Sequence, residues 1–146
     1  MAAVKCARLT RGDKKTVTEL NLLLQQLSSS SHPMTMPLLR VILKNKNFYL
    51  AVLRDDKKIV GMGSILMWHA PTGLRSRIED VVVDESYRGR GFGALLTEHL
   101  IVAAKKAKAK DIELSSRPSR IPANALYKKL GFEQKETNVY QMKFQK

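Results

Sequence analysis

The residues best suited to chemistry lie in segment 81–94, where an apolar strand gives way to an amphipathic helix. Between the two stand arginines and glycines in alternation, Arg88-Gly89-Arg90-Gly91-Phe92-Gly93. The first amides of a helix lack intrahelical partners and lie at the positive end of its dipole, so this position suits an anion. Glycine has no Cβ and lets a phosphate approach the backbone closely. The segment therefore predicts a pyrophosphate site, with a simple tight turn as the alternative.

The glycine spacing excludes two other phosphate sites. A dinucleotide-binding fingerprint requires Gly-x-Gly-x-x-Gly, which the alternating glycines do not form. A P-loop requires Gly-x-x-x-x-Gly-Lys-Ser/Thr, and no lysine follows Gly93 at the required place. The pattern that remains is Arg88-x-x-Gly91-x-Gly93, directly after an apolar strand that ends in an acidic turn.

This pattern resembles the acyl-CoA signature of the GNAT superfamily of acetyl-CoA-dependent N-acetyltransferases. A second segment similar to the family follows later in the chain, Ala125-Leu126-Tyr127-Lys128-Lys129-Leu130-Gly131-Phe132. The resemblance implies acetyl-CoA as the cofactor, a primary amine of a small molecule as the acceptor, and direct attack in a ternary complex. The alternatives are a protein or peptide amine as acceptor, or a non-catalytic module that binds CoA or nucleic acid.

The resemblance also assigns the coenzyme-binding residues. Pantetheine is expected to pair as a pseudo-strand with Val81, Val82 and Val83, and an amide of Val81 or Val83 is expected to stabilise the oxyanion at a splay or bulge. The pyrophosphate is expected to bind the run Arg88, Gly89, Arg90, Gly91, Phe92, Gly93 and Ala94. Many family members carry an asparagine at the position of Arg120; Asn124 is the candidate that replaces it here.

Acetyl transfer to an amine requires a neutral amine and benefits from a proton for the departing thiolate. By resemblance Tyr127 is the general acid and also contacts CoA, with its phenol near the sulfur. From the residues alone, a tyrosine packed on a helix face is the simpler interpretation. Side chains alternate in a regular strand, so Glu79 and Asp80 point to opposite faces and only one can line a cleft. Glu79, on the face of Val81 and Val83, is the predicted base, directly or through water. An ion pair with a nearby arginine is the alternative.

Composition limits the class of protein. Lysine and arginine total 26 against 13 acidic residues, a net charge of +13, which attracts polyanions in general. The lysines are dispersed and few aromatic residues accompany them, so nucleic acid is disfavoured as a partner. A single cysteine, Cys6, excludes an internal disulfide and offers no metal site. No apolar run is long enough for a bilayer, so we expect a cytoplasmic protein without membrane contact. A homodimer stays open.

The order of elements predicts one domain over residues 1–146. Propensities alone indicate only α/β or α+β, whereas the resemblance implies the GNAT acyl-CoA N-acyltransferase fold. That fold has a central mixed, mostly antiparallel sheet of about six to seven strands with about four helices. Strands are expected over 4–9, 48–53, 58–68, 77–83, 111–115, 132–133 and 138–144. Helices are expected after the capping-box spacing Thr10-Arg11-Gly12-Asp13 and over 37–45, 91–109 and 122–129.

The acceptor is expected to bind between three connecting segments, 28–37, a loop over 69–76, and the turn near 137–138. Arg117 and Arg120 would suit an anionic or phosphorylated acceptor. The run Ile78-Glu79-Asp80-Val81-Val82-Val83 is similar to the branch that acetylates glucosamine 6-phosphate. The chain departs from that branch at Ser115, where the branch carries an acidic residue.

Overall fold

A computed structural model describes residues 3–29 and 32–145. The chain divides into two compact units, the first ending at Ser115 and the second beginning at Ser116. A single domain over residues 1–146 stays a prediction.

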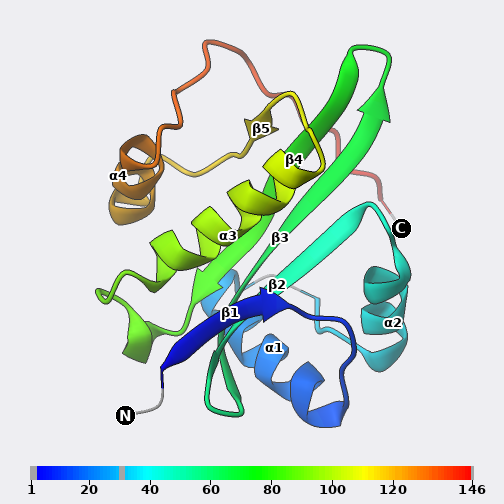
Figure 1. Ribbon diagram of the computed structural model, residues 1–146, viewed down its shortest axis with the longest axis vertical. Helices are drawn as coiled ribbons and strands as arrows, with labels where there is room; N and C mark the ends of the chain where they lie inside the picture. Colours follow the sequence, from blue (N-terminus) through cyan, green and yellow to red (C-terminus); the bar gives the residue numbers. More distant parts are fainter. Residues whose placement is uncertain (1–2, 30–31, 146) are drawn as a thin grey trace. The chain divides into compact units, whose positions relative to one another are not determined.

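The first unit holds one mixed sheet of five strands in the order β1-β2-β3-β4-β5 (Figure 1). All neighbouring strands are antiparallel except β4 and β5, which are parallel. The strands are β1 (Val4–Arg8), β2 (Phe48–Asp55), β3 (Lys58–Ala70), β4 (Gly73–Val83) and β5 (Ile112–Glu113). Short connections join β2 to β3 and β3 to β4, so these three form a continuous meander.

Within the described residues, the first unit has three helices and the second unit has one. They are α1 (Lys14–Leu27), α2 (Met36–Lys44), α3 (Phe92–Lys106) and, in the second unit, α4 (Ile121–Lys129). A single 3-10 turn, η1 (Glu85–Tyr87), lies between β4 and α3. Thr35 caps α2 by accepting a hydrogen bond from the amide of Leu38 at 3.2 Å.

The sheet of the first unit has a hydrophobic layer on each face. On one face α1 and α2 supply Leu20, Leu23 and Leu39, which pack with Met62 and Val82 of the sheet. On the other face lies α3, whose Leu96 and Leu100 are fully buried. Gly63 of β3 allows this approach, because a Cβ built there would lie 3.2 Å from the Leu100 Cδ1 atom and 3.4 Å from the Leu96 Cδ2 atom. The helix that follows the predicted pyrophosphate turn is thus held firmly against β3 and β4.

Two local predictions from the sequence are wrong, one on the residue that caps a helix and one on the length of a loop. The capping box of α1 begins at Asp13 rather than Thr10: Asp13 accepts from the amide of Thr16 at 2.9 Å, and the Thr16 hydroxyl accepts from the amide of Asp13 at 3.2 Å. The loop expected over 69–76 is a tight hairpin. Ala70 pairs with Gly73, whose φ of +121° lets the chain reverse over two residues.

The two closing strands predicted over 132–133 and 138–144 are absent from the described part of the chain, so the expected count of six to seven strands is wrong. Tyr140, Met142 and Phe144 alternate with polar residues as in a half-buried strand, but Tyr140 and Phe144 are each 88% exposed. Alternation produces a strand only where a second strand supplies hydrogen-bond partners, and no strand of residues 3–29 and 32–145 pairs with this segment.

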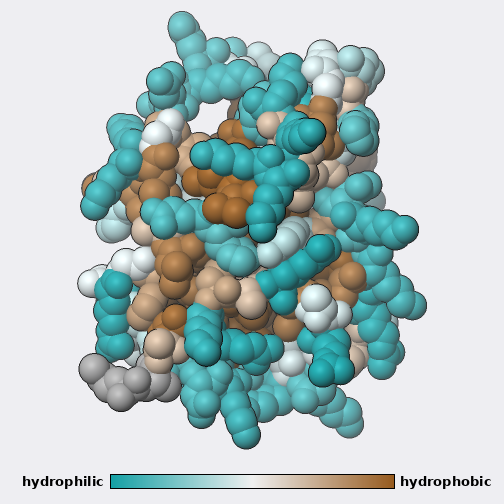
Figure 2. All heavy atoms as spheres, in the orientation of Figure 1, coloured by the Kyte–Doolittle hydropathy of each residue, from teal (hydrophilic) through white to brown (hydrophobic). Residues whose placement is uncertain are grey.

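The surface reflects the basic composition. Hydrophilic side chains cover much of the face drawn in Figure 2, with apolar atoms visible between them. Among residues 3–29 and 32–145, no helix has the length and apolar character that crossing a membrane requires.

Candidate coenzyme and acetyl-transfer site

The segment that joins β4 to α3, residues 84–91, is here called the diphosphate loop. It begins with Asp84, whose Oδ1 accepts hydrogen bonds from the amide of Ser86 at 2.9 Å and from its hydroxyl at 2.7 Å. These two bonds hold the pKa of the Asp84 carboxyl below its usual value. The amide of Glu85 donates to Oε1 of Gln26 on α1 at 2.9 Å. The loop is therefore tied to the body of the first unit where it leaves the sheet.

The end of the diphosphate loop has the geometry of an anion site. Gly89 and Gly91 have φ values of +77° and +83°, and a Cβ at either would meet no atom within 4 Å. Gly91 is the N-cap of α3 and offers no side-chain cap. The first intrahelical bond is donated by Leu95 to the Gly91 carbonyl at 3.1 Å, so the amides of residues 92–94 are available to a ligand. Open backbone, free amides and a positive dipole end fit a diphosphate.

The two arginines of the loop are both exposed and both turned toward the loop itself. Arg88 donates through Nε to the carbonyl of Val83 at 2.9 Å. The guanidinium of Arg90 lies 5.3 Å from the centre of the Tyr87 ring. Each guanidinium keeps further N–H groups for an incoming phosphate.

The strand before the loop has an open edge. The ladder between β4 and β5 comprises only the pairs Ser76–Ile112 and Arg77–Glu113. Beyond Arg77, in the part of the chain that the structure describes, no strand lies beside this edge of β4. Residues 78–83 therefore offer backbone groups to an extended, amide-bearing ligand such as pantetheine.

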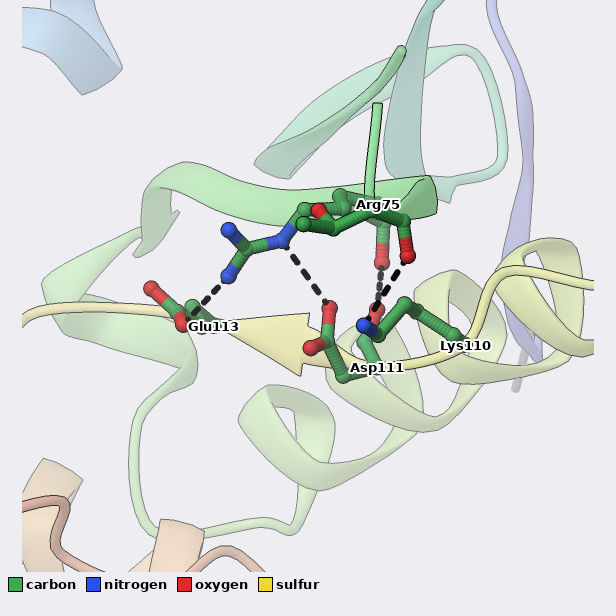
Figure 3. A network of polar contacts seen from close by, with 6 residues as sticks. Arg75, Lys110, Asp111 and Glu113 are labelled. Atoms are coloured by element: carbon green, nitrogen blue, oxygen red, sulfur yellow. Dashed lines mark hydrogen bonds and ion pairs between the residues drawn. The ribbon is translucent and has the colours of Figure 1, made fainter. Parts of the chain in front are cut away.

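Figure 3 shows the polar contacts that hold the short strand β5 to β4 near the beginning of their ladder. Arg75 reaches from β4 across β5, donating to Oε1 of Glu113 at 2.8 Å, and its Nε lies 3.7 Å from Oδ1 of Asp111. Lys110 adds a hydrogen bond from its amide to the Leu74 carbonyl at 2.8 Å. These contacts keep β5 beside the start of β4.

Replacing Arg75 with methionine should therefore lower the free energy of unfolding by about 1 kcal/mol, the usual size of a partly exposed charged hydrogen bond. Urea denaturation measures the difference. Arg54→Met is the matched control, because Arg54 makes only a 3.5 Å hydrogen bond to the Lys57 carbonyl. Equal losses in the two variants would contradict an anchoring role for Arg75.

A β-bulge interrupts β4 at the base of the open edge. Met62 pairs with Val82 but Ser64 pairs with Glu79, so Gly63 alone faces both Asp80 and Val81. Asp80 adopts a φ of +56°. Such a bulge in the central strand is what the resemblance to GNAT enzymes implied near Val81.

The bulge overturns the simple alternation expected for this strand. Val82 belongs to the core beneath α1 and α2. Ile78 instead pairs with Ile65, which shares the α3 face with Gly63. Ile78 and Val82 therefore lie on opposite faces, although they are four residues apart, because the extra residue shifts the phase by one.

The two acidic residues at the bulge differ in their surroundings. Glu79 accepts a hydrogen bond from Nε of Arg77 at 2.5 Å, which is the ion pair that the sequence left as the alternative to a free base. Arg77 also donates to the Ser115 hydroxyl at 2.6 Å. Asp80 is an exposed residue, yet partial desolvation of its carboxyl, and secondly the charge of Glu79, raise its pKa. The sequence favoured Glu79 over Asp80 on the basis of regular alternation, and only the resemblance implied a bulge nearby. Aspartate tolerates a positive φ better than most residues do.

The second unit carries the other two predicted site residues. Tyr127 is buried on α4, where its ring meets the edge of Phe132 at 5.9 Å between centroids. Burial raises the pKa of its phenol, and the charge of Arg120 opposes the shift. Asn124 donates through Nδ2 to the carbonyls of Arg117 and Arg120 at 2.9 and 2.8 Å. The predicted site residues thus fall in two groups. The first unit carries Glu79, residues 81–83 and residues 88–94, and the second unit carries Asn124 and Tyr127.

Two further reactive side chains of the first unit are those of His99 and Cys6. His99 on α3 shares a 2.7 Å hydrogen bond with the hydroxyl of Tyr49 on β2. Burial raises the pKa of the Cys6 thiol to about 11, so little thiolate exists near neutral pH. Within residues 3–29 and 32–145, no three His, Cys, Asp or Glu side chains are grouped to hold a metal ion.

The family assignment follows from a match with known sequences. The model of the acetyltransferase (GNAT) family matches residues 17–132, most of the chain. This protein belongs to the GNAT family. The match runs from α1 through the diphosphate loop to Phe132, so it includes segments of both units.

Two curated relatives are N-acetyltransferases by name. The uncharacterized N-acetyltransferase ycf52 of Pyropia yezoensis is 28% identical over 114 residues, which are 75% of this chain and 62% of that protein. The uncharacterized N-acetyltransferase MJ1207 of Methanocaldococcus jannaschii is 39% identical over 61 residues, 42% of this chain and 27% of that protein. This GNAT chain spans less than two thirds of the length of either relative.

Solved GNAT structures share the fold. A putative acetyltransferase from Agrobacterium tumefaciens str. C58 has a TM-score of 0.82 at 23% identity, covering 97% of this chain and 99% of that one. Glucosamine-6-phosphate N-acetyltransferase from Arabidopsis thaliana has 0.81 at 21%, with 96% and 98% covered. The aminoglycoside N-acetyltransferase AAC(6')-Iy in complex with CoA has 0.81 at 17%, with 98% and 96% covered. These likenesses confirm the predicted GNAT fold, apart from the number of strands.

Proposed function

We propose that this GNAT protein is an N-acetyltransferase that moves the acetyl group of acetyl-CoA to a primary amine of a small molecule by direct attack in a ternary complex. The observation that carries the proposal is the continuous backbone surface of the first unit. It consists of the edge of β4 over residues 78–83, beside which no strand of the described residues lies, followed by the open glycines and the free amides at the start of α3. Pantetheine and diphosphate follow each other in CoA in the same order.

In this proposal the predicted CoA-binding residues have the following roles. Val81, Val82 and Val83 pair with the pantetheine amides, and the run from Arg88 to Ala94 binds the diphosphate. When bound, acetyl-CoA supplies an activated acetyl group as a thioester. An amide at the bulge, from Val81 or Val83, stabilises the negative charge that develops on the reacting oxygen. Tyr127 protonates or hydrogen-bonds the departing sulfur, and Asn124 is a further contact to CoA.

A small-molecule acceptor is the version that two lines of support favour. The names of two solved neighbours state an aminoglycoside and glucosamine 6-phosphate as acceptors. Arg117 and Arg120 on the second unit suit an anionic or phosphorylated acceptor. Ser115, where the glucosamine 6-phosphate branch has an acid, argues against that particular sugar. A protein or peptide amine, and a non-catalytic CoA binder, are the competing functions. A single domain, a cytoplasmic location and a homodimer stay predictions.

The test is release of the CoA thiol from acetyl-CoA in the presence of amino sugars, aminoglycosides, polyamines and lysine-containing peptides. Turnover with one of the small amines is the expected result. Turnover with peptides alone would sink the small-molecule acceptor. CoA binding without turnover on any amine would instead favour the non-catalytic module.

For the base, we expect Glu79→Gln to lower kcat about 100-fold, the usual scale of general base catalysis. Asp80→Asn is the matched comparison, because asparagine also tolerates the positive φ at this position. That variant is expected to keep kcat within about threefold if Glu79 alone carries the proton. The opposite ranking would transfer the role to Asp80, whose pKa is raised.

A further inference from the structure

The side chain of Tyr87, in the diphosphate loop, contacts four other side chains. Its hydroxyl donates to Oδ2 of Asp55 at 2.6 Å. Its ring lies 5.3 Å from the Arg90 guanidinium and 5.9 Å from Nζ of Lys58. The ring of Phe92 is tilted against it, with 6.3 Å between centroids. These contacts with two cations, a carboxylate and another ring hold the Tyr87 side chain in a defined position.

These contacts join two parts of the first unit that are distant in sequence. Asp55 is the last residue of β2 and Lys58 the first of β3, so both belong to the tip of the β2–β3 hairpin. Arg90 and Phe92 flank Gly91, the cap of α3. Tyr87 thus links the hairpin tip to the end of the loop where the free amides begin.

The end of the loop needs such a link more than its beginning does. The beginning is held by backbone, since the amide of Asp84 donates to the Val60 carbonyl at 2.8 Å. The end contains Gly89 and Gly91, which lose more conformational freedom on ordering than other residues do. A ligand that must order these glycines itself binds more weakly, because part of the binding free energy is spent on ordering.

The bond between Tyr87 and Asp55 is of the stronger kind. A phenol that donates to a carboxylate makes a charge-assisted hydrogen bond. The pKa of Tyr87 is raised, chiefly by this bond, so the phenol keeps its proton at neutral pH. Arg90 lies at the same ring, and its charge opposes this rise in the pKa of Tyr87.

We propose that Tyr87 and Asp55 are positioning residues that lock the diphosphate loop onto the β2–β3 hairpin and so preform its end for the diphosphate of CoA. The inference rests on the proposed function, because it takes CoA as the ligand of the loop. Neither residue needs to touch the coenzyme. The lock acts through Arg90 and through the amides that follow Gly91.

The experiment measures the dissociation constant of CoA by calorimetry for the full chain and four variants. Tyr87→Phe keeps the ring and removes the hydroxyl, and Asp55→Ala removes the acceptor. Each is expected to weaken CoA binding about tenfold, equivalent to ~1.4 kcal/mol. Asp55→Asn retains a carbonyl oxygen as acceptor and should recover most of the loss. Tyr49→Phe is the matched control, since it also loses a 2.7 Å side-chain hydrogen bond, to His99, away from the loop.

Two further readouts separate positioning from general stability. The double variant Tyr87→Phe with Asp55→Ala should bind CoA no more weakly than either single variant, since both remove one bond. Initial rates should show a raised KM for acetyl-CoA with an unchanged KM for the acceptor. Additive losses, or a parallel loss in Tyr49→Phe, would overturn the inference.

Hydrogen exchange of the free protein supplies an arm that does not depend on the coenzyme. The amides of residues 88–91 should exchange faster in Tyr87→Phe than in the unchanged chain. Unchanged exchange there overturns the lock. If the unchanged protein binds CoA and Tyr87→Phe binds it equally well, the inference fails and the proposed function stands. If the unchanged protein does not bind CoA at all, the proposed function fails, and the coenzyme part of the inference fails with it.

Discussion

Replacing Gly91 with valine should weaken CoA binding at least about 100-fold, which corresponds to ~2.7 kcal/mol. Gly91 has a φ of +83°, a conformation that costs a β-branched residue of order 1–3 kcal/mol. The Cβ and its methyl groups would also enter the space above the first amides of α3, which the protein itself leaves empty. Strain and obstruction act in the same direction, so the effect should exceed that of any single arginine of the loop. Calorimetric titration with CoA measures it.

Gly73→Ala is the control for the strain alone. Gly73 has a φ of +121° in the β3–β4 turn, and a Cβ there would meet only methylene groups of Lys110, the nearer at 3.2 Å. This variant should lose stability on heating but bind CoA nearly as tightly as the unchanged chain. If Gly91→Val binds CoA normally, the ligand does not lie over these amides, and the assignment of the diphosphate loop is wrong.

Tyr127→Phe should lower kcat about 100- to 1,000-fold while the dissociation constant of CoA changes little, as expected for loss of a general acid. The phenol is suited to this role because burial raises its pKa above the ordinary value. It therefore stays protonated, and able to donate, throughout the neutral and mildly alkaline range. Steady-state rates at saturating acetyl-CoA measure kcat.

The pH dependence gives an independent check on Tyr127. A raised pKa means that the donor is lost only as the pH rises through that raised value, so no alkaline decline from this group should appear below about pH 10. Tyr140→Phe offers a comparison for stability, because Tyr140 is 88% exposed. An unchanged kcat in Tyr127→Phe would remove the phenol from the mechanism and favour the non-catalytic reading of the protein.

The sequence was most informative where local chemistry decides structure. The alternation of Arg88, Gly89, Arg90 and Gly91 predicted a strand–turn–helix with an open backbone, and both glycines have the positive φ that this requires. The apolar period after Phe92 likewise predicted a helix packed on the sheet. In these segments the residue types themselves favour the backbone conformation that the structure shows.

Features that depend on distant partners were not predictable in the same way. Pro71 and Gly73 indicated a loop over 69–76, yet the register of β3 with β4 pairs Ala70 with Gly73 and leaves only Pro71 and Thr72 in the turn. Tyr140 and Phe144 alternate as in a strand, but alternation alone supplies no neighbour. The hydrogen bond from Tyr87 to Asp55 joins the 3-10 turn η1 to the end of β2, and no spacing in the sequence predicts it.

The bulge at Asp80 has a consequence for comparing this protein with its relatives. Side chains alternate on both sides of the bulge, but with opposite parity. On the face of the sheet beneath α1 and α2 lie the odd-numbered residues of β4 before the bulge and the even-numbered residues after it. An alignment that slides a gap across this point would exchange inward for outward positions while leaving the apolar composition of β4 untouched. The strand therefore has to be aligned as two separate blocks, each anchored by its own partners on β3.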